Sequence, residues 1–282
     1  MTTSEAVEQV RGLDIRSVGV SSILTPASGF MSRYRYTLNP YSGCSFGCSY
    51  CYARYFTQRL SDREHWGRWV GVKERARAAL RRACARGDLV DGDAIYISTV
   101  TDPYQPIERR LRLTRGLLED LLEFGIQPRM TIQTRSPLVV RDLDLLRQFE
   151  HVRVNMTVTT DDDAVRRRYE PSCPPIEARL DAARLLADAG LPIGISLSPL
   201  LPLRDARAFG AHLAEFDAAE YVTQYVKLGG GWFVSGTPEV VTQTLRDDGW
   251  DERSYHRAVR DLRAGLGERV LLEGMGGYAP AE

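Results

Sequence analysis

Three cysteines crowded into one short stretch constrain what this chain can fold around. Cys44, Cys48 and Cys51 follow the spacing C-x3-C-x2-C, although the whole chain of 282 residues has only 5 cysteines. Soft thiolates this close together suit an iron–sulfur cluster or zinc. Three cysteines leave one iron of a four-iron cluster without a protein ligand, and an open coordination position is typical of a metal centre that does chemistry. The pattern therefore indicates a reactive metal centre.

Other interpretations of these cysteines need no cluster. One is a zinc site with His65 or Cys84 as the fourth ligand, although Cys84 is better explained as a small buried residue on a helix. Another is a disulfide with one thiol left over, and a third is three buried structural cysteines. The glycines and tyrosines around the cysteines, and the lack of a second C-x-x-C pair, favour the cluster.

The residues around the cysteines also carry a family resemblance. Residues 39–54 read N-P-Y-x-G-C…C-x-Y-C-Y-A-R, which resembles the radical SAM superfamily and, within it, spore photoproduct lyase and DNA-repair-photolyase-like proteins. Further similar segments are 101–108, 170–171 and 199–202. The resemblance implies that the three cysteines hold a 4Fe–4S cluster and that S-adenosylmethionine (SAM) chelates the fourth iron through its amino and carboxylate groups.

Apolar periodicity predicts an α/β fold. Strands and helices alternate over residues 35–228, which indicates parallel strands joined by crossover helices. Six strands fit the partial TIM barrel with outer helices that the resembled family has. We expect an N-terminal arm at 1–34, the barrel at 35–228, and an extension at 229–282 that caps the barrel. Strands are predicted at 35–38, 94–98, 129–133, 152–158, 192–197, 221–228 and 269–272, and helices at 52–60, 72–86, 111–124, 140–149, 161–168, 176–189, 205–216, 237–245 and 252–266.

Polar residues follow the predicted strands, where parallel barrels carry their reactive groups. The resemblance implies that Thr101 and Asp102 accept hydrogen bonds from the SAM ammonium group, since a hydroxyl and a carboxylate are both acceptors. Arg135, with Ser136 beside it, is expected to make a bidentate hydrogen bond to the SAM carboxylate. Each of these residues also has a local explanation as a turn former or helix cap.

The adenosine part of SAM has its own expected contacts. The resemblance implies that the backbone of Tyr50 contacts the adenine, that Asn155 and Thr157 bond the ribose hydroxyls, and that the segment from Ser198 to Leu200 lines the adenine.

Cys173 lies outside the cluster motif, in a proline-rich loop. A thiol has a weak S–H bond, so Cys173 is a candidate hydrogen-atom donor to a substrate radical. Spore photoproduct lyase has its donor cysteine near the end of its second strand, where residues 99–101 of this chain have none. The alternative is a small residue that packs a turn.

The resemblance implies reductive cleavage of SAM to a 5′-deoxyadenosyl radical that takes hydrogen from a substrate. A small metabolite or peptide is the favoured substrate because the formal net charge is +0, whereas nucleic-acid-binding proteins are usually basic. The alternatives are repair of a DNA photoproduct and a non-catalytic, metal-binding regulatory protein. The expected electron donor is a one-electron carrier such as flavodoxin or ferredoxin. The sequence shows neither a signal peptide nor an apolar run of the roughly 20 residues that a membrane span needs, so we expect a cytoplasmic enzyme.

Overall fold

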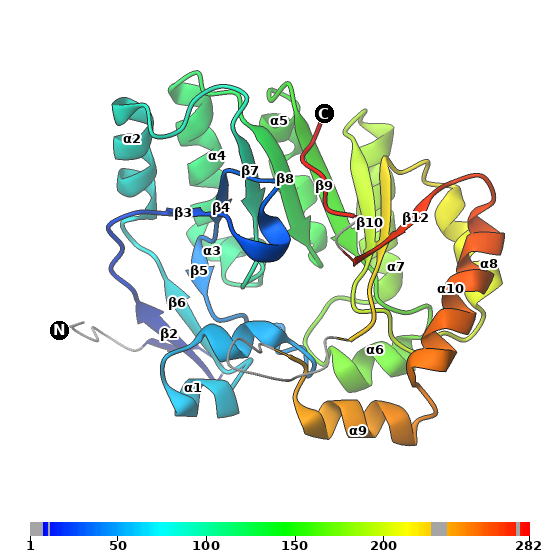
Figure 1. The fold of residues 1–282 in the computed structure, drawn as a ribbon. Helices are drawn as coiled ribbons and strands as arrows, with labels where there is room; N and C mark the ends of the chain where they lie inside the picture. The colour runs from blue at the N-terminus through cyan, green and yellow to red at the C-terminus, as the bar shows by residue number, and fades with distance from the viewer. Residues whose placement is uncertain (1–7, 11, 227–235, 275–276) are drawn as a thin grey trace.

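The main feature of the fold is one curved, mostly parallel sheet (Figure 1). The structure is a computed structural model that describes residues 8–10, 12–226, 236–274 and 277–282. Within these residues the sheet has the strand order β12-β11-β10-β9-β8-β7-β4-β3. Only β3 is antiparallel to its neighbour. The strands are β3 (Leu24–Pro26), β4 (Tyr36–Leu38), β7 (Ala94–Ile97), β8 (Arg129–Thr134), β9 (Val152–Thr157), β10 (Ile193–Leu197), β11 (Glu220–Thr223) and β12 (Leu271–Glu273).

The predicted α/β fold is confirmed, and the six predicted strands are consecutive neighbours from β4 to β11. The central strand β9 is buried at every residue, as expected of a parallel strand covered on both faces. The predicted strand 221–228 ends earlier, at Thr223, and residues 227–228 lie outside the described residues.

Helices cover the outer face of the sheet, with α2 and α4 beside one half and α8 and α10 beside the other (Figure 1). No helix in the described part of the chain is long and apolar enough to cross a membrane. The helices are α1 (Leu60–Glu64), α2 (Ala76–Arg86), α3 (Glu108–Leu111), α4 (Leu113–Glu123), α5 (Leu143–Leu146), α6 (Asp163–Tyr169), α7 (Ile176–Asp188), α8 (Ala206–Ala214), α9 (Glu239–Asp247) and α10 (Glu252–Leu266), with 3-10 turns η1 (Gly29–Met31), η2 (Tyr52–Phe56) and η3 (Pro137–Asp142).

Several predicted helices differ from the structure. The predicted helix 111–124 corresponds to α4, which begins only at Leu113, because the left-handed backbone of Arg112 (φ 51°) separates it from the short helix α3. The predicted helix 52–60 is the 3-10 turn η2 followed by the start of α1, and 140–149 is mostly η3 and the single turn of α5. Short polar-rich helices of this kind are stabilised by their tertiary neighbours more than by their own propensity.

A second, four-stranded sheet was not predicted. Its order is β1 (Glu8–Val10), β2 (Leu13–Ser17), β6 (Trp69–Val72), β5 (Tyr41–Ser42). All four residues of β6 are buried, and the helix predicted from residue 72 begins only at Ala76. This sheet holds the chain on both sides of the cysteine motif, since β5 precedes the motif and β6 pairs with β5.

The chain after residue 236 packs tightly on the sheet and its helices. Helix α10 lies against α8 where two glycines meet: a Cβ on Gly210 would lie 2.4 Å from the carbonyl oxygen of Leu262, and one on Gly265 would lie 2.1 Å from that of Arg207. Strand β12 extends the sheet by pairing with β11.

The last described residues enter the inner face of the sheet. The Tyr34 hydroxyl donates to the carbonyl oxygen of Ala279 at 2.8 Å, and the Arg153 guanidinium donates to the same oxygen at 2.5 Å. Arg153 also pairs with Glu220 at 2.9 Å, and both of these side chains are buried. This end of the inner face is therefore filled by a hydrogen-bonded plug that includes the C-terminal residues.

Candidate active site

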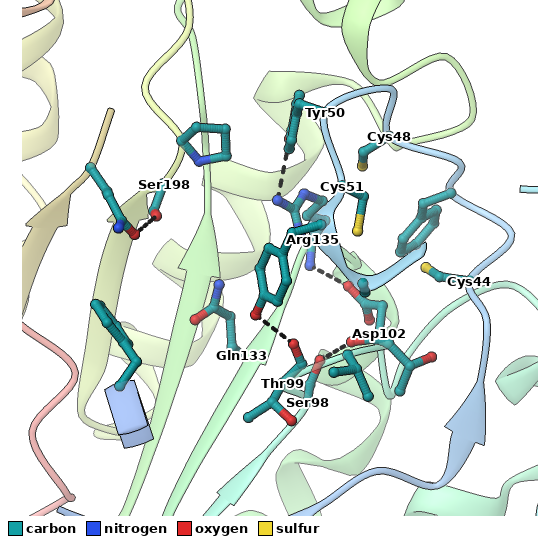
Figure 2. A pocket seen from close by; sticks show the side chains of 18 of the residues that line it. Cys44, Cys48, Tyr50, Cys51, Ser98, Thr99, Asp102, Gln133, Arg135 and Ser198 are labelled. Carbon is teal, nitrogen blue, oxygen red and sulfur yellow. Dashed lines mark hydrogen bonds between the residues drawn. The ribbon is translucent and has the colours of Figure 1, made fainter. Parts of the chain in front are cut away.

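The three motif cysteines line the wall of one pocket on the inner side of the sheet (Figure 2). Gly43 and Gly47 have φ of 69° and 60°, a left-handed conformation that residues with a side chain rarely adopt. The Gly47 N–H donates to the carbonyl oxygen of Cys44 at 3.3 Å, and the Cys51 N–H donates to that of Cys48 at 3.1 Å. These two turns bring three thiols from one short stretch of sequence to one wall of the pocket.

The cysteine loop is packed from outside by the segment 66–69. A Cβ on Gly43 would lie 2.7 Å from the ring of Trp69, and a Cβ on Gly67 would lie 2.8 Å from the Cα of Gly47. Glycine is therefore required at these positions both for the turn and for the close contact.

The positions of the thiols are compatible with a cubane cluster. All five cysteines are free thiols, and no three His, Cys, Asp or Glu side chains of the described residues converge on one metal ion. The zinc candidates point elsewhere, because His65 Nδ1 contacts the Ser61 carbonyl oxygen at 2.8 Å and Cys84 is buried in the core on α2. Cubane ligands bind different irons, so three thiols on one wall suffice. Burial raises the pKa of Cys51 to about 11. A bound metal would favour the thiolate form.

The loop after β7 supports the cysteine loop directly. The Thr101 hydroxyl donates to the carbonyl oxygen of Gly43 at 2.6 Å. The Gln105 side-chain oxygen accepts from the Ser45 N–H at 2.9 Å. These bonds fix the position of the first cysteine relative to the end of β7.

Asp102 joins the ends of two neighbouring strands. Its carboxylate accepts from the Thr134 hydroxyl at 2.7 Å, the Arg135 N–H at 2.9 Å and the Tyr104 N–H at 2.9 Å. Burial raises the pKa of Asp102, although these hydrogen bonds oppose the shift. A carboxylate has about four acceptor positions, and these three donors use three of them.

Arg135 belongs to a buried charged cluster behind the cysteine loop. Glu170 accepts from Arg179 at 2.5 Å, from Arg135 at 3.4 Å, and from the Tyr50 hydroxyl. Burial alone would raise the pKa of Glu170, but the charges of Arg179 and Arg135 hold it at about 2. Arg135 also donates to the Tyr50 hydroxyl at 3.2 Å, which leaves its Nη1 without a hydrogen bond to any described residue (Figure 2).

A family model identifies the superfamily of the chain. The model described as the Radical SAM superfamily matches residues 38–214, well over half of the chain. The chain belongs to the radical SAM superfamily. It is accordingly an enzyme.

Sequence relatives of this radical SAM enzyme occur in archaea and mycobacteria. An uncharacterized protein of Methanocaldococcus jannaschii is 34% identical over 168 residues, which cover 60% of this chain and 61% of that protein. The match thus spans less than two thirds of that relative. An uncharacterized protein of Mycobacterium tuberculosis is 30% identical over 272 residues, covering 88% of this chain and 78% of its own length.

Among solved structures, the radical SAM chain is similar to spore photoproduct lyase. A point mutant of that lyase superposes with a TM-score of 0.57 and 17% identity, covering 92% of this chain and 81% of the lyase. Another structure of the lyase holds AdoMet and dinucleoside spore photoproduct. At this identity the likeness concerns the fold, and it agrees with the predicted radical SAM architecture.

The structure brings together five of the nine residues expected to bind SAM. They line the same pocket as the cysteines and come from the cysteine loop and from the loops after β7, β8 and β10: Tyr50, Thr101, Asp102, Arg135 and Ser198.

The two residues expected to bond the ribose hydroxyls form hydrogen bonds with other protein groups instead. Asn155 accepts from Arg153 Nε at 3.0 Å, and the Thr157 hydroxyl accepts from the Gln133 amide at 3.2 Å. Both are fully buried and neither lines the pocket. They lie two residues apart on β9 and so face the same side of the sheet, and Asn155 pairs in register with the pocket residue Gln133.

Ser136 and Leu200 also lie off the pocket wall. The Ser136 hydroxyl caps η3 by accepting from the Leu138 N–H at 3.3 Å, so its local explanation as a cap holds. Leu200 is 0% exposed, and its carbonyl oxygen accepts from the Trp250 indole at 3.2 Å.

The pocket includes residues that we did not predict. Gln133 lies two residues before Arg135 on β8, and Tyr96 lies two before Ser98, so strand alternation was a usable signal for both. Tyr278 also lines the pocket, but it comes from the far end of the chain and no local pattern indicates it.

Cys173 lies behind the cysteine loop and is not among the residues that line the pocket. Its sulfur is 3.6 Å from that of Cys48, and its side chain is buried. Its carbonyl oxygen accepts from Arg166 at 2.9 Å, which fixes the proline-rich turn. Direct hydrogen transfer from this thiol to a molecule in the pocket therefore stays a prediction without support from its position.

Proposed function

We propose that this enzyme holds a 4Fe–4S cluster on Cys44, Cys48 and Cys51 and binds SAM in the same pocket. The observation that carries the proposal is the single pocket wall formed by the three thiols, with Arg135 and Asp102 also on the pocket. Cys44, Cys48 and Cys51 would hold the cluster, which would supply the single electron for reductive cleavage of SAM to methionine and a 5′-deoxyadenosyl radical that takes hydrogen from the substrate.

The chain's own residues would orient SAM and keep out water. The Nη1 of Arg135 suits the SAM carboxylate, because its other nitrogens are held by Glu170 and Tyr50 and the guanidinium is thereby fixed in place. Asp102 and Thr101 present oxygens for the SAM ammonium. Aromatic side chains form much of the remaining wall and limit access of water: Phe46, Tyr50, Tyr52, Trp66, Tyr96, Tyr225 and Tyr278.

A small metabolite or peptide is the substrate class that the pocket supports best. Asp102 and Arg135 are the only charged residues among the described ones that line the pocket, and both are bonded within the protein. A pocket built for a phosphate-bearing substrate would be expected to offer further basic groups. The zero net charge agrees with this proposal.

Repair of a DNA photoproduct is the second candidate. The similarity to the spore photoproduct lyase fold favours it. The absence of a cysteine at residues 99–101 speaks against a reaction identical to that of the lyase. In either case we propose a flavodoxin or ferredoxin as the electron donor.

The test is anaerobic reconstitution followed by iron analysis and a SAM-cleavage assay. The wild type should bind about four irons, absorb broadly at about 400 nm, and form 5′-deoxyadenosine from SAM with a reductant. Alanine at Cys44, Cys48 or Cys51 should abolish all three signals, whereas the control Cys84→Ala, in the core on α2, should keep them. Full iron and SAM cleavage in all three motif variants would refute the ligand assignment.

A further inference from the structure

The indole N–H of Trp66 is a buried donor without an acceptor. Its Nε1 makes no hydrogen bond to any described residue, and the Trp66 side chain is only 9% exposed. A buried N–H left unpaired destabilises a protein, so such a group usually has a partner, often a bound one. The neighbouring indole of Trp69 shows the usual situation, since it donates to the carbonyl oxygen of Asp62 at 2.9 Å.

Trp66 lies beside the cysteine loop. It lines the pocket that Cys44, Cys48 and Cys51 also line. The next residue, Gly67, is in contact with Gly47, the glycine between the first two cysteines, where a Cβ would come within 2.8 Å of the Gly47 Cα. The unpaired donor is therefore held next to the loop that carries the three thiols.

We propose that Trp66 Nε1–H donates a hydrogen bond to a sulfur of the iron–sulfur cluster, either a cysteine thiolate or a bridging sulfide, and raises its reduction potential. This inference rests on the proposed function, because it requires the cluster. Hydrogen bonds to the sulfurs are one of the means by which proteins set cluster potentials. Reduction adds negative charge to the acceptor, and hydrogen bonds to charged acceptors are the stronger ones, so the N–H stabilises the reduced state more than the oxidised state.

The experiment compares Trp66→Phe with Trp69→Phe in reconstituted protein without SAM. Midpoint potentials are measured by redox titration followed by electron paramagnetic resonance. In Trp66→Phe the ratio of reduced to oxidised cluster at the wild-type midpoint should fall about tenfold, which is about 59 mV for a one-electron couple. Trp69→Phe should leave the midpoint unchanged, because that indole donates to Asp62. The Trp69 ring also packs against Gly43, so a general disturbance of the loop would appear in this control as well.

A second measurement detects the hydrogen bond itself. Protein refolded and reconstituted in deuterium oxide should show an exchangeable deuteron coupled to the reduced cluster, present in the wild type and in Trp69→Phe and absent in Trp66→Phe. If Trp66→Phe fails to fold, replacement of Trp66 by 3-benzothienylalanine keeps the ring shape and removes only the N–H.

The outcomes separate this inference from the proposed function. A wild type that binds no cluster overturns both. A wild type with a cluster, together with an unchanged midpoint or a retained deuteron coupling in the position-66 variant, overturns the role of Trp66 alone.

Discussion

Glu170→Gln tests how much the buried charged cluster contributes to stability. The substitution keeps the side-chain shape but removes the negative charge shared by Arg179 and Arg135. Lowering the pKa of Glu170 from its ordinary 4.5 to about 2 corresponds to about 3 kcal/mol of stability at pH 7. Removing one partner of a buried ion pair costs about 3–5 kcal/mol. Solvent screens this ion pair little, because the side chains of Glu170 and Arg179 are both 0% exposed.

The pH dependence has a defined sign. A carboxyl with a lowered pKa in the folded state contributes its full stability above its unfolded-state pKa, and loses it as the pH falls through the folded-state pKa. The stability difference between wild type and Glu170→Gln should therefore be constant from pH 7 to about pH 5, and should narrow as the pH falls from about 4.5 toward 2.

The assay is urea unfolding of the cluster-free protein, followed by circular dichroism at pH 7, 5 and 4. The control is Glu123→Gln, which removes an exposed partner of Arg81 and should change stability far less, because surface ion pairs are weak. A loss no larger than that of the control, or a difference that does not narrow below pH 4.5, would refute the reasoning about Glu170.

Three further predictions concern the loop, the remaining cysteine and the substrate. Gly67→Ala should lower the iron content after reconstitution, since its Cβ would clash with Gly47 and its φ of 95° is strained for alanine; iron equal to wild type would contradict the proposed contact. Cys173→Ala should keep the cluster and still form 5′-deoxyadenosine. Product analysis with the true substrate then decides the role of Cys173. A changed product, or a reaction that stalls at the substrate radical, assigns hydrogen donation to this thiol, and an unchanged product assigns packing of the turn. Binding to duplex DNA should have a Kd no tighter than about 10⁻⁶ M at physiological salt, and nanomolar binding to thymine-lesion DNA would restore the repair alternative.

The parallel core could be predicted because its strands are short segments rich in β-branched and other apolar residues, set between clear helices. The run from Val152 to Thr157 alternates apolar and polar residues, and this period is recognisable in isolation. Strand β6 was missed because its four residues gain their structure from pairing with β2 and β5, which a local pattern cannot show. The break at Arg112 depends on a left-handed backbone conformation that arginine does not indicate.

The pocket residues also divide into those that the sequence predicts and those that it does not. Residues at strand ends, such as Asp102 and Arg135, could be placed there because parallel strands bring their carboxyl ends together. Which protein groups a strand residue bonds is harder to predict, and the side-chain oxygen of Asn155 accepts from Arg153 instead of lining the pocket. Trp66 and Tyr278 reach the pocket from segments with no motif of their own, so only tertiary structure reveals them.

The plug at the inner face also has a consequence for the order of folding on the ribosome. Tyr34, just before β4, bonds to a carbonyl 245 residues later, and Arg153 bonds to the same group 126 residues later. Contacts this distant in sequence form late, because the intervening chain must be ordered first. Since residue 220 is synthesised before residue 279, we expect Arg153 and Glu220 to pair first and to receive the carbonyl group of Ala279 afterwards.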